Sequence, residues 1–334
     1  MRIPIFFTFN NWYTLAAEVA FYSLLKNGST ANEYALYVLS GDLFDSSKKR
    51  LERIVSLFPN ASIEFKNVVD YQERYQLPEG KSHFSSEMFY KLIAADVFPE
   101  YDRILCSDVD VVFEGDVSSA YTDFPDEDFY FAGTTWFLNR SSSGNTVQGM
   151  SPAEREKMTW GIRAGFLLLN LEKIRNSNIQ QEMAEFYLNN FQRLELPEQD
   201  TITLCCYPHL RYLHWKYCVL NYYYSMERSD VKFLPQSPYH ELSGDSEEAL
   251  SAFYDVINHP VQLHYVGPNK PWNRLFVDKQ LVWMRYAIQA GVFSRFLIEF
   301  PRQFWKTLGR YSVSRFIRKM KTRSRALSAQ TATS

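Results

Sequence analysis

Two hydrophobic periods alternate along the first hundred residues of the chain. Unbroken apolar runs, which are typical of buried strands, occupy residues 3–9, 34–39 and 62–65. Apolar residues at helical spacing occupy residues 15–25 and 45–58 between them. The order strand, helix, strand, helix, strand is typical of a mainly parallel sheet with helices on its faces. The pattern therefore predicts an α/β protein.

The same alternation continues to residue 266. Further strands are expected at residues 104–106, 111–113, 129–132, 163–170 and 261–266. Further helices are expected at residues 83–98 and 172–191 and from Pro197 onward, since proline suits the first turn of a helix. Residues 137–158 are rich in Ser, Gly and Asn, which predicts a mobile loop over a site.

Two carboxylates follow the predicted strand at 104–106. Asp108 and Asp110 are separated by Val109, so in an extended chain both side chains point to the same side. They repel each other unless a cation neutralises them, and hard oxygen ligands suit Mg²⁺ or Mn²⁺. An aspartate at a strand end is also a common turn or capping residue. The position favours the metal, because open α/β sheets bind ligands where their strands end.

Three later polar groups are candidates with equally simple alternatives. Glu198, Gln199 and Asp200 open an apolar helix, where carboxylates also serve merely to complement the helix dipole. His264 lies on an apolar strand, as many core histidines do. Lys270 is the cation of a Gly-Pro-Asn-Lys-Pro-Trp loop that suits an anion or is a plain turn.

Five blocks of the sequence together resemble glycosyltransferase family 8. In chain order they are IFFTFNNWY, DVD, AGFLLLNLEKIR, EQD and HYVGPNKPW, and they span residues 3 to about 275. Members of this family are retaining, metal-dependent sugar transferases with a GT-A fold, and they include lipopolysaccharide galactosyl- and glucosyltransferases. The resemblance implies a hexosyltransferase that uses a UDP-sugar donor, Mn²⁺ or Mg²⁺, and a saccharide or lipid-linked saccharide acceptor.

The resemblance also implies roles for individual residues. The metal ligands would be Asp108, Asp110 and His264, and the groups beside the anomeric centre would be Glu198, Gln199 and Asp200. Tyr13 would stack on the uracil, and Lys270 would hold the diphosphate. The complete set of positions implied to bind the donor is Thr8, Asn10, Tyr13, Lys91, Asp108, Val109, Arg163, Ala164, Gly165, Gly267 and Lys270.

The chain departs from the family pattern in three regions. Asn10 and Asn11 stand where acidic residues are common, with Trp12 in place of a usual Asn. Arg163 replaces a usual Asn beside the donor sugar; a cation there could favour an acidic sugar, or its side chain could turn away into solvent. Lys91 replaces a usual Arg, which exchanges a bidentate fork for a point charge.

Charge is divided unevenly along the 334 residues. The stretch from Arg302 to the end holds nine Lys or Arg and no acidic residue, while residues 1–301 carry a net charge of −11. An acidic body argues against nucleic-acid binding, and a basic tail with interleaved aromatics suits an anionic membrane. A disordered solubilising tail is the alternative. Four cysteines without zinc-finger spacing, and the lack of a signal peptide, point to the cytoplasm and the inner face of the membrane.

We therefore expect a GT-A-like catalytic domain over residues 1–275, a helical extension over 276–301 and a basic amphipathic tail over 302–334. Two other classes of protein share some of these features. A sugar nucleotidyltransferase would need a Gly-rich basic loop after the first strand, where this chain has FTFNNWY. A non-catalytic nucleotide-sugar-binding or membrane-associated partner protein is compatible with the departures at Asn10, Trp12 and Arg163.

Overall fold

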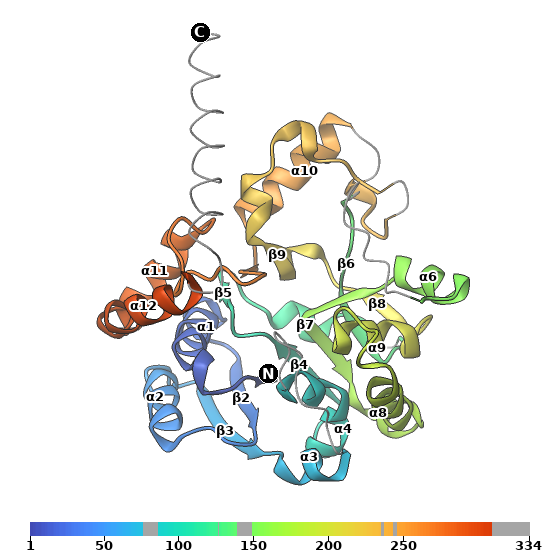
Figure 1. Ribbon diagram of the computed structural model, residues 1–334, viewed down its shortest axis with the longest axis horizontal. Coiled ribbons are helices and arrows are strands. Elements are labelled where there is room, and N and C mark those ends of the chain that lie inside the picture. Colours follow the sequence, from blue (N-terminus) through green and yellow to red (C-terminus); the bar gives the residue numbers. More distant parts are fainter. Residues whose placement is uncertain (76–85, 126, 139–148, 235–236, 243–245, 309–334) are drawn as a thin grey trace.

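The computed structural model describes residues 1–75, 86–125, 127–138, 149–234, 237–242 and 246–308. Its centre is a seven-stranded sheet in the order β3-β2-β1-β4-β7-β6-β8 (Figure 1). The strands are β1 (Arg2–Thr8), β2 (Glu33–Ser40), β3 (Ala61–Asn67), β4 (Arg103–Ser107), β6 (Phe131–Thr135), β7 (Ile162–Asn170) and β8 (Leu210–Tyr212). The first four run parallel, β8 is parallel to β6, and β7 is antiparallel to both of its neighbours. The predicted mainly parallel α/β sheet is confirmed.

Helices cover both faces of this sheet (Figure 1). One hydrophobic cluster lies under α1 (Thr14–Asn27), α2 (Asp45–Val55), α11 (Gln280–Gln289) and α12 (Phe293–Leu308). A second cluster lies on the other face, under η2 (Ser86–Ile93), α4 (Ala94–Val97), α7 (Leu171–Arg175), α8 (Ile179–Asn190) and α9 (Pro197–Cys206). Shorter helices are α3 (Val69–Tyr75), α5 (Ser118–Thr122) and α6 (Pro152–Thr159).

A second, three-stranded sheet lies beyond the end of β4. It consists of β5 (Val111–Phe113), β10 (Gln262–His264) and β9 (Val219–Leu220), in that order. The chain passes from the large sheet to the small one through residues 108–110. Strand β10 pairs antiparallel with β5, with His264 opposite Val111. This register brings a residue more than 150 positions away along the chain next to the two aspartates.

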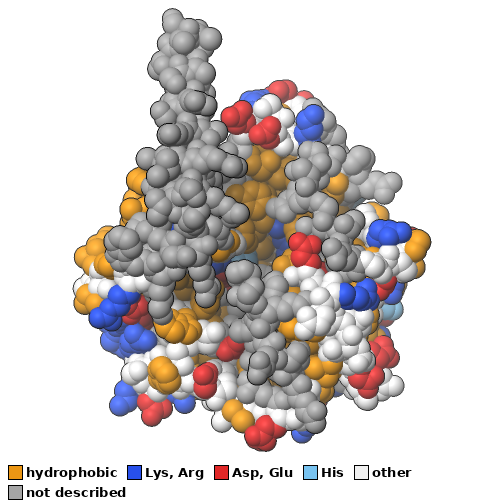
Figure 2. Space-filling view, in the orientation of Figure 1, with side chains coloured by type: hydrophobic (Ala, Val, Ile, Leu, Met, Phe, Trp, Pro, Cys, Tyr) orange, Lys and Arg blue, Asp and Glu red, His pale blue; other side chains and the backbone are white. Residues whose placement is uncertain are grey.

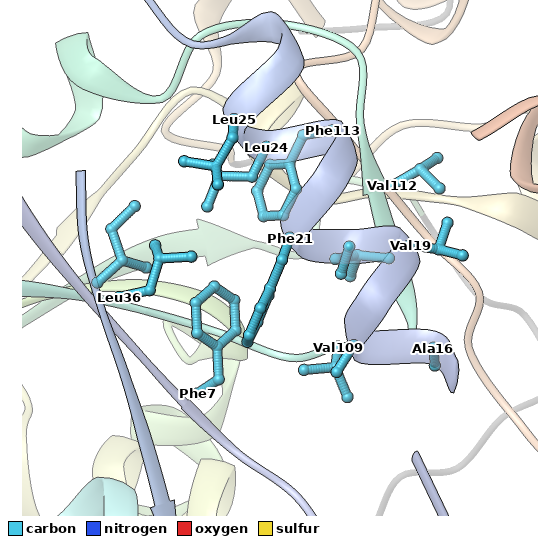
Figure 3. Packing of buried hydrophobic residues seen from close by; sticks show 14 of the residues in the cluster. Phe7, Ala16, Val19, Phe21, Leu24, Leu25, Leu36, Val109, Val112 and Phe113 are labelled. Carbon is cyan, nitrogen blue, oxygen red and sulfur yellow. The ribbon is translucent and has the colours of Figure 1, made fainter. Parts of the chain in front are cut away.

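The turn between the two sheets is anchored by the core. The ring of Phe7 in β1 packs 4.6 Å from that of Phe21 in α1, and the side chain of Val109 points into the same cluster (Figure 3). Val109 is almost fully buried. The burial of Val109 anchors this bend, and the carboxylates of Asp108 and Asp110 on either side of it meet at a common site with His264.

An aromatic cluster supports the small sheet from the other side. It lies under α10 (Glu247–Asn258), where the rings of Trp215 and Phe253 stack at 5.6 Å. Phe137 and Tyr223 belong to the same cluster. The short elements here are η3 (Trp215–Cys218), η4 (Asn221–Ser225), η5 (Arg228–Asp230) and η6 (His240–Leu242). This part of the chain had no clear periodicity, because aromatic packing and 3₁₀ turns organise it.

Several predicted boundaries were wrong for local reasons. The helix expected at 83–98 is the 3₁₀ segment η2 followed by α4, and residues 76–85 lie outside the described residues. The helix expected at 172–191 is divided into α7 and α8 by Asn176-Ser177-Asn178, which are turn-forming residues. The loop expected at 137–158 contains α6, which Ser151 opens with a capping box.

The helical extension is fixed to the body by a buried ion pair. Glu18 in α1 has no exposed surface, and burial raises the pKa of its carboxyl. Arg295 in α12 donates to this carboxylate. Trp283 in α11 is also fully buried and packs 5.7 Å from the Trp272 ring. The extension is therefore part of the folded core of the described structure.

Replacing the cation of this pair should destabilise the fold. We expect Arg295→Ala to lower the free energy of unfolding by about 3–5 kcal/mol, because it leaves a buried carboxylate without its partner. Arg302→Ala, at an exposed position of the same helix, is the matched control. Urea unfolding followed by tryptophan fluorescence measures both variants. Equal midpoints for the two variants would show that the pair does not hold the extension in place.

Candidate active site

Asp108 and Asp110 stand at the carboxyl end of the parallel strands. Phe7 of β1 pairs with Ser107 of β4, so Thr8 and Asp108 leave the sheet side by side. The backbone is fixed on both sides of the turn. Asp108 N–H donates to the carbonyl of Gly165 at 3.1 Å, and Tyr265 N–H donates to the carbonyl of Asp110 at 2.9 Å. The two carboxylates share one side, as the sequence predicted.

His264 completes a three-residue cluster with the aspartates. One ligand atom from each of Asp108, Asp110 and His264 lies within 4.8 Å of the others. His264 Nε2 is 3.1 Å from Asp110 Oδ1 and 3.7 Å from Asp108 Oδ2. Two carboxylate oxygens and one imidazole nitrogen form a donor set that fits a first-row divalent cation such as Mn²⁺.

Gly165 makes room for this cluster. A Cβ added to Gly165 would lie 2.6 Å from Nδ1 of His264 and 3.5 Å from Oδ2 of Asp108. The first distance is far below any ordinary van der Waals contact. The close approach of His264 to β7 therefore requires glycine at this position, which agrees with a small residue beside a ligand site.

In the described structure, each of the two aspartates forms an ion pair with a lysine. Lys270 Nζ is 2.5 Å from Asp110 Oδ2 and also donates to the carbonyl of Tyr265. Lys91 Nζ is 2.6 Å from Asp108 Oδ1 and donates to the carbonyl of Ala164 at 3.0 Å. Both lysines are buried. Each aspartate thus has a cation of its own, which offsets the repulsion between the pair.

These contacts shift the pKa values of His264 and Asp110. Burial alone would lower the pKa of His264, but Asp110 outweighs it and raises that pKa to about 10. Burial alone would raise the pKa of Asp110, but Lys270 and His264 hold it well below its usual range. The raised pKa favours a protonated His264 at neutral pH, and a metal ion that bound its ring nitrogen would have to displace that proton.

The first turn of α9 presses its polar residues against β7. The side-chain oxygen of Gln199 accepts from the N–H of Ala164 at 3.2 Å. Glu198 lies 4.0 Å from Lys91 Nζ, and its Oε2 is buried without a hydrogen-bond partner among the described residues. Burial raises the pKa of Glu198 to about 7. Glu198 and Gln199 thus reach the strand that carries Gly165, close to the cluster.

Asp200, unlike Glu198 and Gln199, binds the backbone of the turn that precedes α9. Its Oδ2 accepts from the backbone N–H groups of Glu195 and Leu196, at 3.0 and 2.9 Å. Burial raises the pKa of Asp200 to about 6, and those hydrogen bonds oppose the rise. One oxygen of Asp200 therefore holds the turn that leads into α9, and the same turn places Glu198 and Gln199.

The implied nucleotide side of the site is lined by loop residues. Asn10 caps η1 (Asn11–Tyr13) by accepting from the N–H of Trp12. Tyr13 packs edge-on against Trp272 at 6.0 Å, and burial together with Asp110 and Asp108 raises the pKa of its hydroxyl. Gly267 has φ of +77°, which favours glycine, and an added Cβ would meet no atom within 4 Å.

Several neighbours of the cluster were missed by sequence reasoning. Cys218 Sγ lies 3.7 Å from Nδ1 of His264. Arg163 donates to the hydroxyl of Tyr223 at 3.0 Å and lies over the ring of Trp136 at 4.1 Å. Cys218, Tyr223 and Trp136 come from segments without a motif, so only the fold reveals them. Val109, by contrast, was named as donor-binding, yet its side chain is in the core and only its backbone remains available.

Comparisons with known proteins agree with this geometry. The model of the family described as Glycosyl transferase family 8 matches residues 4–275. General stress protein A of Bacillus subtilis is 23% identical over 258 residues, which cover 76% of this chain and 81% of that protein. Lipopolysaccharide 1,3-galactosyltransferase of Salmonella typhimurium is 23% identical over 259 residues, which cover 75% of this chain and 66% of that protein.

Solved structures share the fold. The apo bifunctional glycosyltransferase WbbM has a TM-score of 0.69 at 18% identity; the match covers 90% of this chain but only 52%, about half, of WbbM. Galactosyltransferase LgtC in complex with donor and acceptor sugar analogues has a TM-score of 0.61 at 18% identity, and the match covers 87% of this chain and 95% of LgtC. The expected GT-A fold is thereby confirmed. With a family match over most of its length, this chain belongs to glycosyl transferase family 8 and is a glycosyltransferase.

Proposed function

We propose that this protein transfers a hexose from a UDP-sugar to a saccharide or lipid-linked saccharide acceptor with retention of anomeric configuration, and that it acts in lipopolysaccharide synthesis. The observation that carries the proposal is the cluster of Asp108, Asp110 and His264 at the carboxyl end of the parallel strands, with Lys270 beside it. The match to a lipopolysaccharide galactosyltransferase and the fold of LgtC support the substrate class.

The cluster fits a divalent cation, most simply Mn²⁺ with Mg²⁺ as an alternative. The donor set is of the right kind, and Gly165 is kept free of a side chain that would displace His264. A cation bound by these residues would neutralise the charge that develops on the diphosphate as the sugar–phosphate bond breaks.

Lys270 and Lys91 could bind either the aspartates or the donor diphosphate. While Asp110 is paired with Lys270, the ammonium group cannot also bind a phosphate at full strength. If a bound cation neutralised the aspartates, Lys270 and Lys91 would be free to form hydrogen bonds with oxygen atoms of the donor. Lys270 needs only a short movement, because the carbonyl of Tyr265 already holds its Nζ.

The transfer itself needs no acid from the protein. The bond between the anomeric carbon and the phosphate oxygen breaks, the acceptor hydroxyl oxygen forms the new bond on the same face, and its proton passes to the leaving phosphate. Gln199, which accepts from the N–H of Ala164 on β7, is proposed to stand beside the anomeric centre, and Glu198, 4.0 Å from Lys91, is proposed to help position the transferred sugar. Thr8, Asn10, Tyr13 and Gly267 are proposed to line the nucleotide and diphosphate.

Two surface features suggest where the acceptor is found. Hydrophobic side chains gather over α11 and α12 (Figure 2), and the exposed ones include Phe276, Leu281, Ile288, Leu297 and Ile298. The basic tail follows this surface directly, although residues 309–334 lie outside the described residues. Among the described helices, none is long and apolar enough to cross a bilayer. We propose that the extension (276–301) and tail (302–334) dock the catalytic domain (1–275) on the anionic cytoplasmic face of a membrane.

A non-catalytic role in binding nucleotide sugars is the remaining alternative. The intact carboxylate pair, with His264 and both lysines in contact with it, weighs against this alternative. The first strand ends in η1 rather than in a glycine-rich phosphate loop, which weighs against a sugar nucleotidyltransferase.

Asp110→Asn should abolish metal-dependent transfer while the fold survives. The substitution keeps the shape of the side chain but removes the charge that faces both His264 and Lys270. We expect UDP release from the accepted UDP-sugar to fall by at least about a thousandfold, which corresponds to about 4 kcal/mol of lost stabilisation. Asp255→Asn, at an exposed position of α10, is the matched control and should behave as wild type. Turnover within a few-fold of wild type for Asp110→Asn would refute the metal role.

Mn²⁺ affinity should rise with pH. In the metal-free protein the pKa of His264 is raised to about 10, so between pH 6 and 8 the ring is protonated and must lose its proton to bind a cation. We expect the association constant to increase about tenfold per pH unit over this range, which is the slope for one proton released. Isothermal titration calorimetry in buffers of different ionisation enthalpy counts that proton. A constant affinity with no proton release would exclude His264 as a ligand.

Removing the residues after Phe300 should weaken binding to membranes. Vesicles of phosphatidylglycerol are expected to sediment the full chain but much less of the truncated one, with the difference shrinking in high salt because charge drives the contact. Phosphatidylcholine vesicles are the matched control surface. Equal sedimentation of both proteins with phosphatidylglycerol would rule out the tail as the anchor.

A further inference from the structure

Arg163 is a buried cation that has no anionic partner among the described residues. Its side chain is 7% exposed, and among the described residues no carboxylate lies within ion-pair distance of it. In the part of the chain that the structure describes, its side chain donates one hydrogen bond, to the hydroxyl of Tyr223. The ionisable groups around it are tyrosine hydroxyls and the thiol of Cys218. Every other buried cation at this site, by contrast, has a carboxylate within hydrogen-bond distance.

Burying such a cation lowers the stability of the folded protein. Arginine stays charged in proteins, so it does not escape the cost of burial by losing its proton. Burying a charge without an opposite charge costs far more than burying a hydrogen-bonded neutral group. A methionine or leucine would fill the same space without that cost. Because the described residues supply no counter-charge, this position is suited to an anion that a ligand brings.

The guanidinium is held in a fixed orientation. The ring of Trp136 lies against its face at 4.1 Å, and Tyr223 takes one N–H of Nη2. Among the described residues the N–H groups at Nε and Nη1 have no acceptor, and Arg163 as a whole keeps 7% of its surface exposed. A guanidinium edge presents two parallel N–H groups, which matches a carboxylate or a phosphate.

Arg163 lies next to the residues that are proposed to surround the transferred sugar. Arg163 precedes Ala164 and Gly165, whose backbone contacts Lys91, Gln199 and Asp108. Cys218 adjoins both Arg163 and His264, since its Sγ lies 3.7 Å from Nδ1 of that histidine. The shortest ion pairs of Lys270 and Lys91 are with the aspartates instead, at the position proposed for the diphosphate.

We propose that Arg163 pairs with an anionic group, a carboxylate or a phosphate, on the saccharide that the enzyme transfers or on its acceptor. The inference deepens the proposed function and rests on it. It makes Arg163 a residue that determines specificity: an acidic sugar satisfies the buried charge, and a neutral one leaves it unpaired. A site that buries an unpaired polar group rejects the incomplete substrate strongly.

The experiment compares Arg163→Gln with wild type on paired substrates. In the first arm, UDP release with Mn²⁺ is measured for UDP-glucuronate and UDP-galacturonate against UDP-glucose and UDP-galactose. If the anion is on the donor, wild type prefers the acidic donor, and the variant loses that preference by about tenfold to a hundredfold, the range for a charge-assisted hydrogen bond. Arg163→Lys should retain part of it.

In the second arm, the donor is kept constant and acceptors with and without a phosphate or uronate are compared. If the anion is on the acceptor, release of UDP without acceptor is the same in both proteins, and only transfer to the acidic acceptor falls in the variant. Arg74→Gln removes an exposed arginine and is the matched control in both arms. An equal loss with acidic and neutral substrates in both arms would overturn the proposal and leave Arg163 a positioning residue.

Two binding measurements separate this proposal from its foundation. UDP affinity in the presence of Mn²⁺ should be the same for wild type and Arg163→Gln; a matching loss would assign Arg163 to the diphosphate and overturn the proposal. If wild type releases UDP from none of the donors, the proposed function fails. The Arg163 proposal is then tested by thermal unfolding alone. Glucuronate, but not glucose, must then raise the Tm of wild type and leave that of the variant unchanged. Without that difference the proposal fails as well.

Discussion

The mutual repulsion of two neighbouring carboxylates is the constraint on which this structure depends. Asp108 and Asp110 are forced to one side because Val109 is buried between them. At 4 Å in a medium of effective dielectric constant 20, two like charges repel by about 4 kcal/mol. The fold balances this with three cations from elements far apart in the chain: Lys91 on η2, His264 on β10 and Lys270 in the loop after it.

Each of those cations depends on a separate part of the architecture. His264 reaches the aspartates only because β10 pairs with β5 in one register and because β7 has glycine where they meet. Lys91 is fixed by the carbonyl of Ala164 on β7, and Gln199 fixes the same residue from α9. A divalent cation that bound the aspartates would therefore compete with the fixed positive charges of Lys91 and Lys270.

Much of this site was predictable from sequence because its residues lie in compact blocks. The period of the apolar runs predicted the parallel sheet, and alternation around Val109 predicted that the aspartates face the same way. Lys91 and Arg163 were identified only as departures from a family pattern, and the pairing of Lys91 with Asp108 was not foreseen. Trp136, Cys218 and Tyr223 carried no signal, because long-range packing, rather than local periodicity, brings them to the site. The 3₁₀ geometry of η2 was missed for the same reason: its apolar residues are compatible with an α-helix, and tertiary packing decided otherwise.

Soaking crystals of the protein with Mn²⁺ and UDP, and locating the metal by its anomalous scattering, tests the central claim most directly. The account predicts one strong peak bounded by Asp108, Asp110 and His264, with Nζ of Lys270 moved from Asp110 to a phosphate oxygen. A peak elsewhere, or UDP bound while Lys270 stays on Asp110, would contradict it.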